Sequence, residues 1–226
     1  MAKVSKIALT GGPCAGKTSV IEALKYEFGE DVVIVPEVAT QLIVPLDEGG
    51  VGIPGVDVEW SQEWQDNLQR KITEKQIEDE TYQIQLADLR ERPTVVICDR
   101  GVLDGAAYVE GGRDEFLRTF NLDLEKCYAL YDQIIHLSSL ACDDPEKYLE
   151  LLKTNPSRTE PPEKAAELDQ KLFAIYEGHP NHKRVSSKKG IEAKIELVLS
   201  EIRQELERLK RELDVEIASE GKPRTI

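Results

Sequence analysis

The sequence lacks several features that would place it in whole classes of protein. No apolar run approaches the ~20 residues of a membrane-spanning helix, and Gly11 interrupts the apolar start at residues 7–10 before it can form a signal-peptide core. Positive charge is scarce, because 29 Lys and Arg stand against 43 Asp and Glu, a formal net charge of −14. We therefore expect a cytoplasmic protein with no membrane span and no nucleic-acid surface, since such a surface needs a basic footprint.

Cysteine is sparse, and its spacing argues against a zinc or disulfide framework. Cys14, Cys98, Cys127 and Cys142 form no Cys-x-x-Cys pair, so we expect reduced thiols. Cys14 lies in a glycine-rich segment, where it is either a small loop-filling residue or a redox-sensitive thiol. The three histidines share no spacing with a Cys or Glu cluster and are interpreted as structural or surface residues.

What is present is the alternation of strand and helix patterns typical of an α/β fold. Strands are expected at 6–10, 32–35, 94–98, 133–137 and 183–186, and helices at 17–28, 37–44, 59–92, 145–153, 161–178 and 191–216, with short helices between 102 and 129. This alternation predicts a parallel sheet flanked by helices. We divide the chain into a core over 1–186, a C-terminal amphipathic helix over 187–216 and a flexible tail over 217–226. That helix either packs on the core or mediates a homodimer.

One glycine-rich segment between the first strand and the first helix carries the strongest functional signal. Its residues, Gly11, Gly12, Pro13, Cys14, Ala15, Gly16, Lys17 and Thr18, fit the P-loop pattern G-x-x-x-x-G-K-[ST]. Such a loop turns backbone N–H groups around phosphate oxygens, and the following helix adds its positive dipole end. Lys17 is expected to reach the β- and γ-phosphates, and the Thr18 hydroxyl to bind Mg²⁺. The alternative is a glycine turn without a ligand.

Asp99 and Arg100 follow the apolar strand 94–98, at the sheet edge where the P-loop also lies. We predict that Asp99 orders Mg²⁺ and that Arg100 offers its planar donors to a phosphate. For Asp99 the alternative is a turn cap or a pair with Arg100, and for Arg100 it is a local salt bridge. Asp104, at a helix-start position, is either a substrate contact or a cap.

Two further residues are candidates for chemistry beside the phosphates. Glu37 follows the second strand and either accepts a proton from an acceptor hydroxyl or merely begins a helix after Pro36. Arg158 lies in a polar connection and either closes over the triphosphate as a lid arginine or is a solvated surface residue. The glycine-rich stretch 45–58 is predicted to be a mobile loop that covers a substrate.

A long segment without proline or glycine, 59–92, predicts one helix with a regular apolar stripe. Trp60, Trp64, Leu68 and Ile72 recur every four residues, and we interpret the stripe as core. The alternative is that the two tryptophans stack on a base.

Three motifs in order, 9–18, 35–40 and 98–105, together resemble the NadR-like AAA-type ATPase family, which includes the TRPL translocation-defect proteins. The resemblance extends over about 5–186, through Tyr131-Asp132, 158–160 and Leu168-Asp169. It implies a kinase-like P-loop fold with sheet order 2-3-1-4-5, distantly related to deoxynucleoside and ribosylnicotinamide kinases. In that likeness Glu37 matches the carboxylate after the second strand, Asp99-Arg100 the acidic-arginine pair, and Arg158 the lid arginine.

Three functions fit these residues. The first is a Mg²⁺-dependent kinase that transfers the γ-phosphate to a small nucleoside-like or riboside acceptor. The second is an ATPase, GTPase or nucleotide-gated binding module without such an acceptor. The third is a protein that binds nucleotide structurally. ATP is favoured over GTP because the sequence contains no Asn-Lys-x-Asp guanine-recognition motif.

Overall fold

A sheet of five parallel strands forms the centre of the computed structural model, which describes residues 3–154 and 160–220. The strands are β1 (Val4–Thr10), β2 (Val32–Val35), β3 (Thr94–Asp99), β4 (Gln133–Leu137) and β5 (His182–Val185). Their order across the sheet is β2-β3-β1-β4-β5, which confirms the predicted order. Each neighbouring pair is parallel, as the continuous apolar strands predict.

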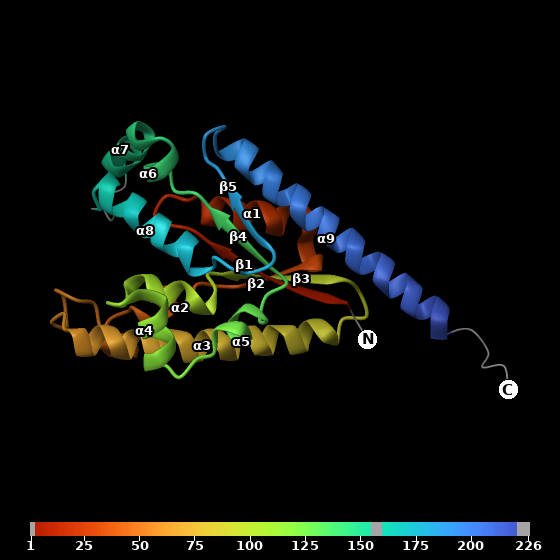
Figure 1. Ribbon diagram of the computed structural model, residues 1–226, viewed down its shortest axis with the longest axis horizontal. Coiled ribbons are helices and arrows are strands. Elements are labelled where there is room, and N and C mark those ends of the chain that lie inside the picture. Colours follow the sequence, from red (N-terminus) through yellow and green to blue (C-terminus); the bar gives the residue numbers. More distant parts are fainter. Residues whose placement is uncertain (1–2, 155–159, 221–226) are drawn as a thin grey trace.

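Helices cover both faces of this sheet, and each face has its own apolar core (Figure 1). One face carries α1 (Lys17–Phe28) and α9 (Ile191–Glu220); the other carries α3 (Gln62–Asp88), α4 (Gly112–Thr119), α5 (Leu124–Tyr128) and the end of α8 (Pro162–Ile175). Successive β1 residues alternate between the cores: Ile7 and Leu9 pack toward α1, and Ala8 packs toward the α3 side.

The remaining elements are short helices and turns that connect the strands and the longer helices along the chain. They are the helices α2 (Val38–Leu42), α6 (Leu140–Asp143) and α7 (Pro145–Thr154), and the 3-10 turns η1 (Gly29–Asp31), η2 (Leu46–Glu48) and η3 (Val102–Tyr108). Segments that leave the carboxyl ends of β1, β2, β3 and β4 begin α1, α2, η3 and α6. In a parallel sheet this edge is where ligands bind, so the topology gathers these four segments around one site.

Several helix ends differ from the sequence predictions, by up to four residues. The helix α3 begins at Gln62 rather than at 59, because the Ser61 Oγ accepts a hydrogen bond from the Trp64 N–H at 3.0 Å and caps the helix there. The helix α9 continues to Glu220, so residues 217–220 are helical rather than part of a flexible tail. Within the residues described, no helix has both the length and the apolar character needed to cross a membrane.

Candidate functional site

The predicted P-loop connects β1 directly to the first turn of α1. Gly11 and Gly16 adopt φ values of 147° and 86°, in the region that favours glycine. A Cβ at Gly11 would lie 2.3 Å from the Leu137 carbonyl oxygen, so this position also requires glycine for close approach. Cys14 adopts φ 56°, a left-handed conformation for a residue with a side chain. The loop therefore has a tightly specified backbone that ends at a helix N-terminus.

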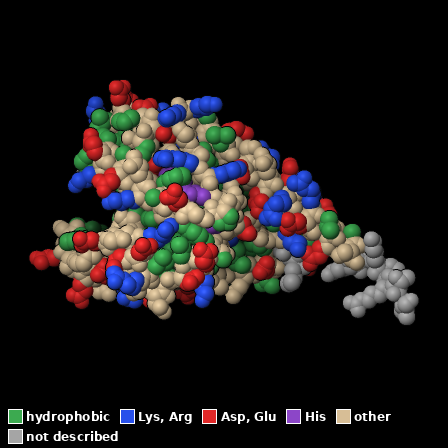
Figure 2. Space-filling view, in the orientation of Figure 1, with side chains coloured by type: hydrophobic (Ala, Val, Ile, Leu, Met, Phe, Trp, Pro, Cys, Tyr) green, Lys and Arg blue, Asp and Glu red, His purple; other side chains and the backbone are tan. Residues whose placement is uncertain are grey.

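A cavity of about 980 Å³ opens over this loop and is called the P-loop cavity below. It is lined by residues 12–19, by Glu37, Asp99, Arg100 and Tyr108, and on its other sides by residues that include Leu140, Tyr148, Glu160, Leu168, Ile191 and Lys194. Figure 2 shows that the molecule is hollowed on its left side, between the part that carries α7 and the part that carries α3. The structure thus brings the P-loop together with Glu37, Asp99 and Arg100; Arg158 lies outside the described residues.

Lys17 supplies positive charge at the base of this cavity. Its Nζ donates to the Gly11 carbonyl oxygen at 3.3 Å. Burial lowers the pKa of Lys17, as does the nearby Arg100 charge, whereas Asp99 and Glu37 act in the opposite direction. Lys17 and Arg100 therefore bring two cationic side chains into a cavity that Glu37 and Asp99 also line, and a phosphate ligand requires such groups.

Asp99 and Thr18 supply the oxygen atoms that suit Mg²⁺. Both line the P-loop cavity, and the buried Asp99 Oδ1 has no hydrogen-bond partner within the described part of the chain. Burial raises the pKa of Asp99, and the negative charge of Glu37 raises it further. The positive charges of Lys17 and Arg100 act in the opposite direction, and the pKa of Asp99 is raised on balance. The residues described contain no group of three or more His, Cys, Asp or Glu that could hold a metal. The pair therefore fits an ion that keeps waters and phosphate oxygens as its other ligands.

Glu37 and Arg100 form an ion pair across the P-loop cavity. The Arg100 Nε donates to Glu37 Oε1, and the Thr40 Oγ1 donates to Glu37 Oε2 at 3.1 Å. Burial alone would raise the pKa of Glu37, but the Arg100 and Lys17 charges outweigh it and the pKa is lowered. Glu37 is the N-cap residue of α2, but its side chain makes no capping hydrogen bond to a backbone N–H of that helix.

The backbone of Arg100 is held in a left-handed conformation by residues of α3. Its φ is 80°, and its carbonyl oxygen accepts from the Gln76 Nε2 at 3.1 Å. Its Nη1 lies 3.7 Å from the Asp104 Oδ2. Burial opposes the positive charge, but Tyr108, Glu37 and Asp104 raise the pKa of Arg100 above its ordinary value. Arg100 therefore stays charged and is aimed by an uncommon backbone geometry.

Asp104 is a buried carboxylate that makes the helix-start contact considered for it. Its Oδ1 accepts from the Gly101 N–H at 3.2 Å, which is a helix-start contact, and from the Tyr176 hydroxyl at 2.8 Å. Its Oδ2 accepts from the Thr10 hydroxyl at 2.8 Å. Asp104 also borders a second cavity.

The second cavity has a volume of about 900 Å³ and lies beside the first. Its lining comes from α2, α3, η3 and the 45–58 loop, and includes Val38, Ile43, Pro54, Trp60, Trp64, Gln65, Leu68, Gln69, Ile72 and Asp104. Glu37, Arg100 and Tyr108 line both cavities, so these three residues mark where the two cavities meet.

The tryptophan stripe predicted as core instead forms part of this second wall. Trp60 precedes α3 and is 62% exposed, whereas Leu68 is buried. The Trp64 Nε1 donates to the Val51 carbonyl oxygen at 3.0 Å and so ties α3 to the 45–58 loop. The prediction was wrong for Trp60, because the Ser61 cap starts the helix after it, whereas Trp64 lies within α3 and is half-buried.

Sequence reasoning assigned no role to three residues that border the P-loop cavity or touch its loop, although Asp169 was among the residues of the family resemblance. Tyr108 closes η3, Asp169 lies on α8 and Lys194 lies in the first turn of α9. Tyr108 lies three residues beyond the third motif, 98–105, and that proximity was its available signal. Nothing in the sequence distinguishes Lys194 from a surface lysine, because its partners lie on other elements.

These features define the chain as a P-loop protein that binds nucleotide: a glycine loop between β1 and α1, a lysine at its base, and an acidic residue at the end of β3. The chain belongs to the AAA domain family, whose model matches residues 6–194. No curated protein matches the chain. Among solved structures it is similar to deoxyadenosine kinase from M. mycoides with bound dATP, at 16% identity and a TM-score of 0.48, over 88% of this chain and 99% of that one.

Proposed function

We propose that this protein transfers the γ-phosphate of ATP, with Mg²⁺, to a hydroxyl group of a small nucleoside-like or riboside acceptor. The observation that carries the proposal is the meeting of two cavities, of about 980 and 900 Å³, at Glu37, Arg100 and Tyr108. Hydrolysis needs only water beside the γ-phosphate, whereas transfer needs room for a second substrate there. ATP is proposed over GTP because the sequence has no Asn-Lys-x-Asp motif.

On the phosphate side, the P-loop amides and Lys17 would hold the triphosphate in the P-loop cavity. Thr18 and Asp99 would hold Mg²⁺, which when bound would neutralise charge on the phosphate oxygens. The N-terminus of α1 faces the same cavity and favours negative charge. We also propose that Arg158 closes over the triphosphate.

On the acceptor side, Glu37 would take the proton of the attacking hydroxyl. The lowered pKa of Glu37 keeps its carboxylate ionised, which is the form that accepts a proton, and also makes it a weaker base while Arg100 is paired with it. The acceptor oxygen would then form a bond to the γ-phosphorus while the bond from that phosphorus to the bridging oxygen breaks, releasing ADP. Arg100, next to Glu37, would stabilise the negative charge on the transferred group.

The lining of the second cavity favours an acceptor with a flat ring and polar edges. Trp60 and Trp64 offer aromatic faces, and Val38, Ile43 and Ile72 add apolar surface. Gln65, Gln69 and Asp104 supply amide and carboxylate groups for hydroxyls and ring nitrogens. A nucleoside or riboside combines these features. As part of the same proposal, we place the chain in the NadR-like branch of the AAA-type proteins and in the cytoplasm.

One observation favours a second candidate function, a nucleotide hydrolase or nucleotide-gated binding module. Arg100 is already paired with Glu37, so a γ-phosphate would compete with Glu37 for the guanidinium. Nucleotide binding could then break the pair and move α2, as in a switch.

Product analysis separates the two functions. The purified protein is incubated with Mg²⁺ and ATP, alone and with each of a panel of nucleosides and ribosides, and ADP, inorganic phosphate and phosphorylated acceptor are measured. We expect ADP formation to depend on one class of acceptor, with the phosphate recovered on that acceptor. Release of inorganic phosphate at one rate, with or without acceptors, would favour the hydrolase. The Lys17→Ala variant controls for contaminating activity.

A further inference from the structure

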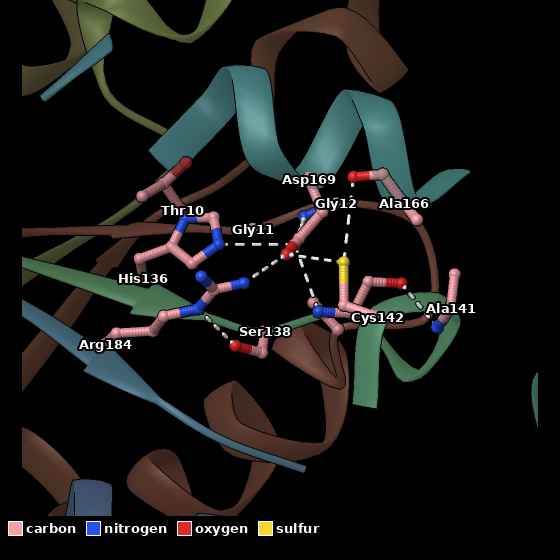
Figure 3. Close-up of polar contacts among 12 residues, drawn as sticks. Thr10, Gly11, Gly12, His136, Ser138, Ala141, Cys142, Ala166, Asp169 and Arg184 are labelled. Atoms are coloured by element: carbon pink, nitrogen blue, oxygen red, sulfur yellow. Dashed lines mark hydrogen bonds and ion pairs between the residues drawn. The ribbon is translucent and has the colours of Figure 1, made fainter. Parts of the chain in front are cut away.

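In the P-loop, the backbone N–H of Gly12 is hydrogen-bonded to a protein side chain rather than left free for phosphate. The Gly12 N–H donates to the Asp169 Oδ1 at 2.9 Å, and Asp169 is fully buried. A Cβ at Gly12 would lie 2.9 Å from the Asp169 Cβ, so α8 packs directly against the loop at this point. Figure 3 shows Asp169 reaching from α8 to the strand ends.

Asp169 is held as an ionised acceptor by groups on three other elements. Its Oδ1 also accepts from the Ser139 N–H at 3.0 Å and lies 3.2 Å from the His136 Nε2. Its Oδ2 accepts from the Arg184 Nη2 at 3.1 Å (Figure 3). Burial would raise the pKa of Asp169, but His136 and the Gly12 and Ser139 amides outweigh it and the pKa is lowered. The carboxylate therefore remains charged and binds the loop amide strongly.

Lys194 contacts the same loop from α9. Its Nζ donates to the Ala15 carbonyl oxygen at 2.8 Å, to the Ser138 carbonyl oxygen at 2.7 Å and to the Ser187 Oγ. Lys194 is 1% exposed and borders the P-loop cavity. A buried ammonium with three acceptors fixes the direction of a carbonyl oxygen that belongs to the loop itself.

We propose that Asp169 and Lys194 are positioning residues for the P-loop, which set its phosphate-binding conformation before nucleotide arrives. The carboxylate holds the N–H of Gly12, and the ammonium holds the C=O of Ala15, three residues later. With both peptide groups fixed, less conformational entropy is lost when phosphate binds to the remaining amides. The two charges are 157 and 179 residues from their loop partners, so α8 and α9 both contribute to the nucleotide site.

This inference rests on nucleotide binding by the P-loop and not on the kinase reaction. Binding is therefore the primary readout, so failure of the kinase proposal and failure of this one are distinguishable. If Asp169 and Lys194 served stability alone, their substitution would lower the melting temperature without changing the affinity of the folded protein for ATP.

The test compares three variants by calorimetric titration with ATP and Mg²⁺, with the folded fraction measured by circular dichroism. Asp169→Asn keeps the shape of the side chain but removes the negative charge that accepts from the Gly12 N–H. Lys194→Met removes the ammonium group that donates to the Ala15 carbonyl oxygen. Arg184→Met is the matched control, since the Arg184 guanidinium donates to the other carboxylate oxygen of Asp169 and to the Ser138 Oγ, and lies 4.9 Å from the centre of the Phe173 ring, rather than holding a peptide group of the P-loop. We expect the Kd for ATP to rise about tenfold or more in each of the first two variants and to stay near wild type in the control.

Two outcomes of the titration would overturn the proposal. One is a wild-type Kd in folded Asp169→Asn and Lys194→Met, and the other is an equal rise in Arg184→Met, which would assign the effect to the buried cluster rather than to the loop contact. In the kinetic assay the KM for ATP should rise while kcat at saturating ATP stays within about twofold, because the residues act on binding and not on the transferred group.

A measurement on the wild-type protein decides the question even if the variants do not fold. The proposal requires that the Gly12 amide be hydrogen-bonded in nucleotide-free protein, so its hydrogen exchange should already be slow and should change little when ATP is added. Fast exchange of the Gly12 amide that slows only with ATP would show that the loop is ordered by nucleotide, and the proposal would be wrong.

Discussion

The P-loop cavity and the second cavity share three residues but are built differently. The base of the P-loop cavity is a loop in which Gly11 and Gly16 have positive φ values, and in which Asp169 and Lys194 hold the peptide groups of Gly12 and Ala15. The second cavity is bounded by side chains of α2, α3 and η3 and by the 45–58 loop, and Trp60 and Tyr108 on its wall are 62% and 42% exposed.

This difference suggests a division of tasks. Triphosphates of all bases present the same oxygens, so a fixed backbone cradle suffices for them. An acceptor must be distinguished by its shape and polar groups, which requires side chains that can differ without disturbing the cradle. Substitutions in the second cavity should therefore change acceptor use and leave ATP binding intact, and substitutions at the loop should do the reverse.

The largest expected effect concerns Glu37, where the two cavities meet. Glu37→Gln keeps the shape but removes the basic group, so we expect acceptor-dependent turnover to fall on the order of 10²-fold or more while the Kd for ATP stays near wild type. Acceptor-dependent ADP formation and ATP titration measure the two quantities.

Thr40→Val is the control for this substitution, because it removes the hydrogen bond to Glu37 Oε2 but keeps the carboxylate. Its turnover should remain within several-fold of wild type. Unchanged turnover in Glu37→Gln would remove Glu37 from the catalytic residues and leave the hydrolase or switch as the better function.

The next effect tests the P-loop cavity alone. Lys17→Ala removes the positive charge beneath the phosphates, and we expect ATP affinity to fall roughly 10²-fold with little change in the melting temperature, since charged hydrogen bonds are each worth several kcal/mol at most and Lys17 is not an apolar core residue. The exposed Lys25, on the same helix, supplies the control Lys25→Ala. Equal affinities in the two variants would contradict a phosphate site at Gly11–Thr18.

Removal of Mg²⁺ tests the oxygen atoms of Thr18 and Asp99. ATP with Mg²⁺ should raise the melting temperature, because ligand at about 100 times its Kd adds about 2.7 kcal/mol to the free energy of unfolding. EDTA should cancel most of that rise in wild type. In Asp99→Asn the rise should be smaller and less sensitive to EDTA. A rise in wild type that EDTA leaves unchanged would exclude the metal roles of both residues.

The P-loop could be predicted from sequence because its motif occupies eight adjacent residues, Gly11–Thr18. Continuous apolar runs such as 94–98 predicted buried parallel strands, whereas the strand order was implied by the resemblance to the NadR-like family. Glu37, Asp99 and Arg100 were brought to the same cavity by one rule, that parallel strands end at a common edge.

The contacts that position the loop could not be predicted in this way. Asp169 and Lys194 lie on amphipathic helices, where charged residues usually face solvent, and only the tertiary fold places them against Gly12 and Ala15. Trp60 was misassigned for a related reason. Helical spacing placed Trp60 in a core stripe, but the Ser61 cap determines where α3 starts.

A smaller effect is expected from the wall of the second cavity. Trp60→Ala removes an exposed aromatic face, so we expect the KM for the acceptor to rise about threefold to tenfold, the scale of one aromatic contact, with ATP affinity unchanged. Tyr26→Ala is the matched control, because Tyr26 on α1 is 92% exposed and lines neither cavity. Weaker ATP binding in Trp60→Ala would show that the two cavities do not divide the tasks as proposed.

The smallest effect concerns the pH dependence of the loop support at Lys194. Burial lowers the pKa of this side chain from 10.5 to about 8, against the opposing charges of Asp143 and Asp169. Between these two pH values the unfolded chain retains a proton that the folded chain has released. Folding then releases a proton, and stability contributed by this residue rises with pH.

Lys194→Met has no such proton, so the melting temperature of wild type minus that of Lys194→Met isolates this titration from all others. We expect the difference to shift in favour of wild type by a few degrees between pH 8 and pH 10.5, since about 1 kcal/mol moves the melting temperature of a domain of this size by roughly 2–4 °C. A difference that stays flat or falls as pH rises would mean that the ammonium is not desolvated beneath the P-loop. In that case Lys194 would remain open to water, as the exposed side chains of the second cavity are, and would not be a buried charge that fixes the P-loop backbone.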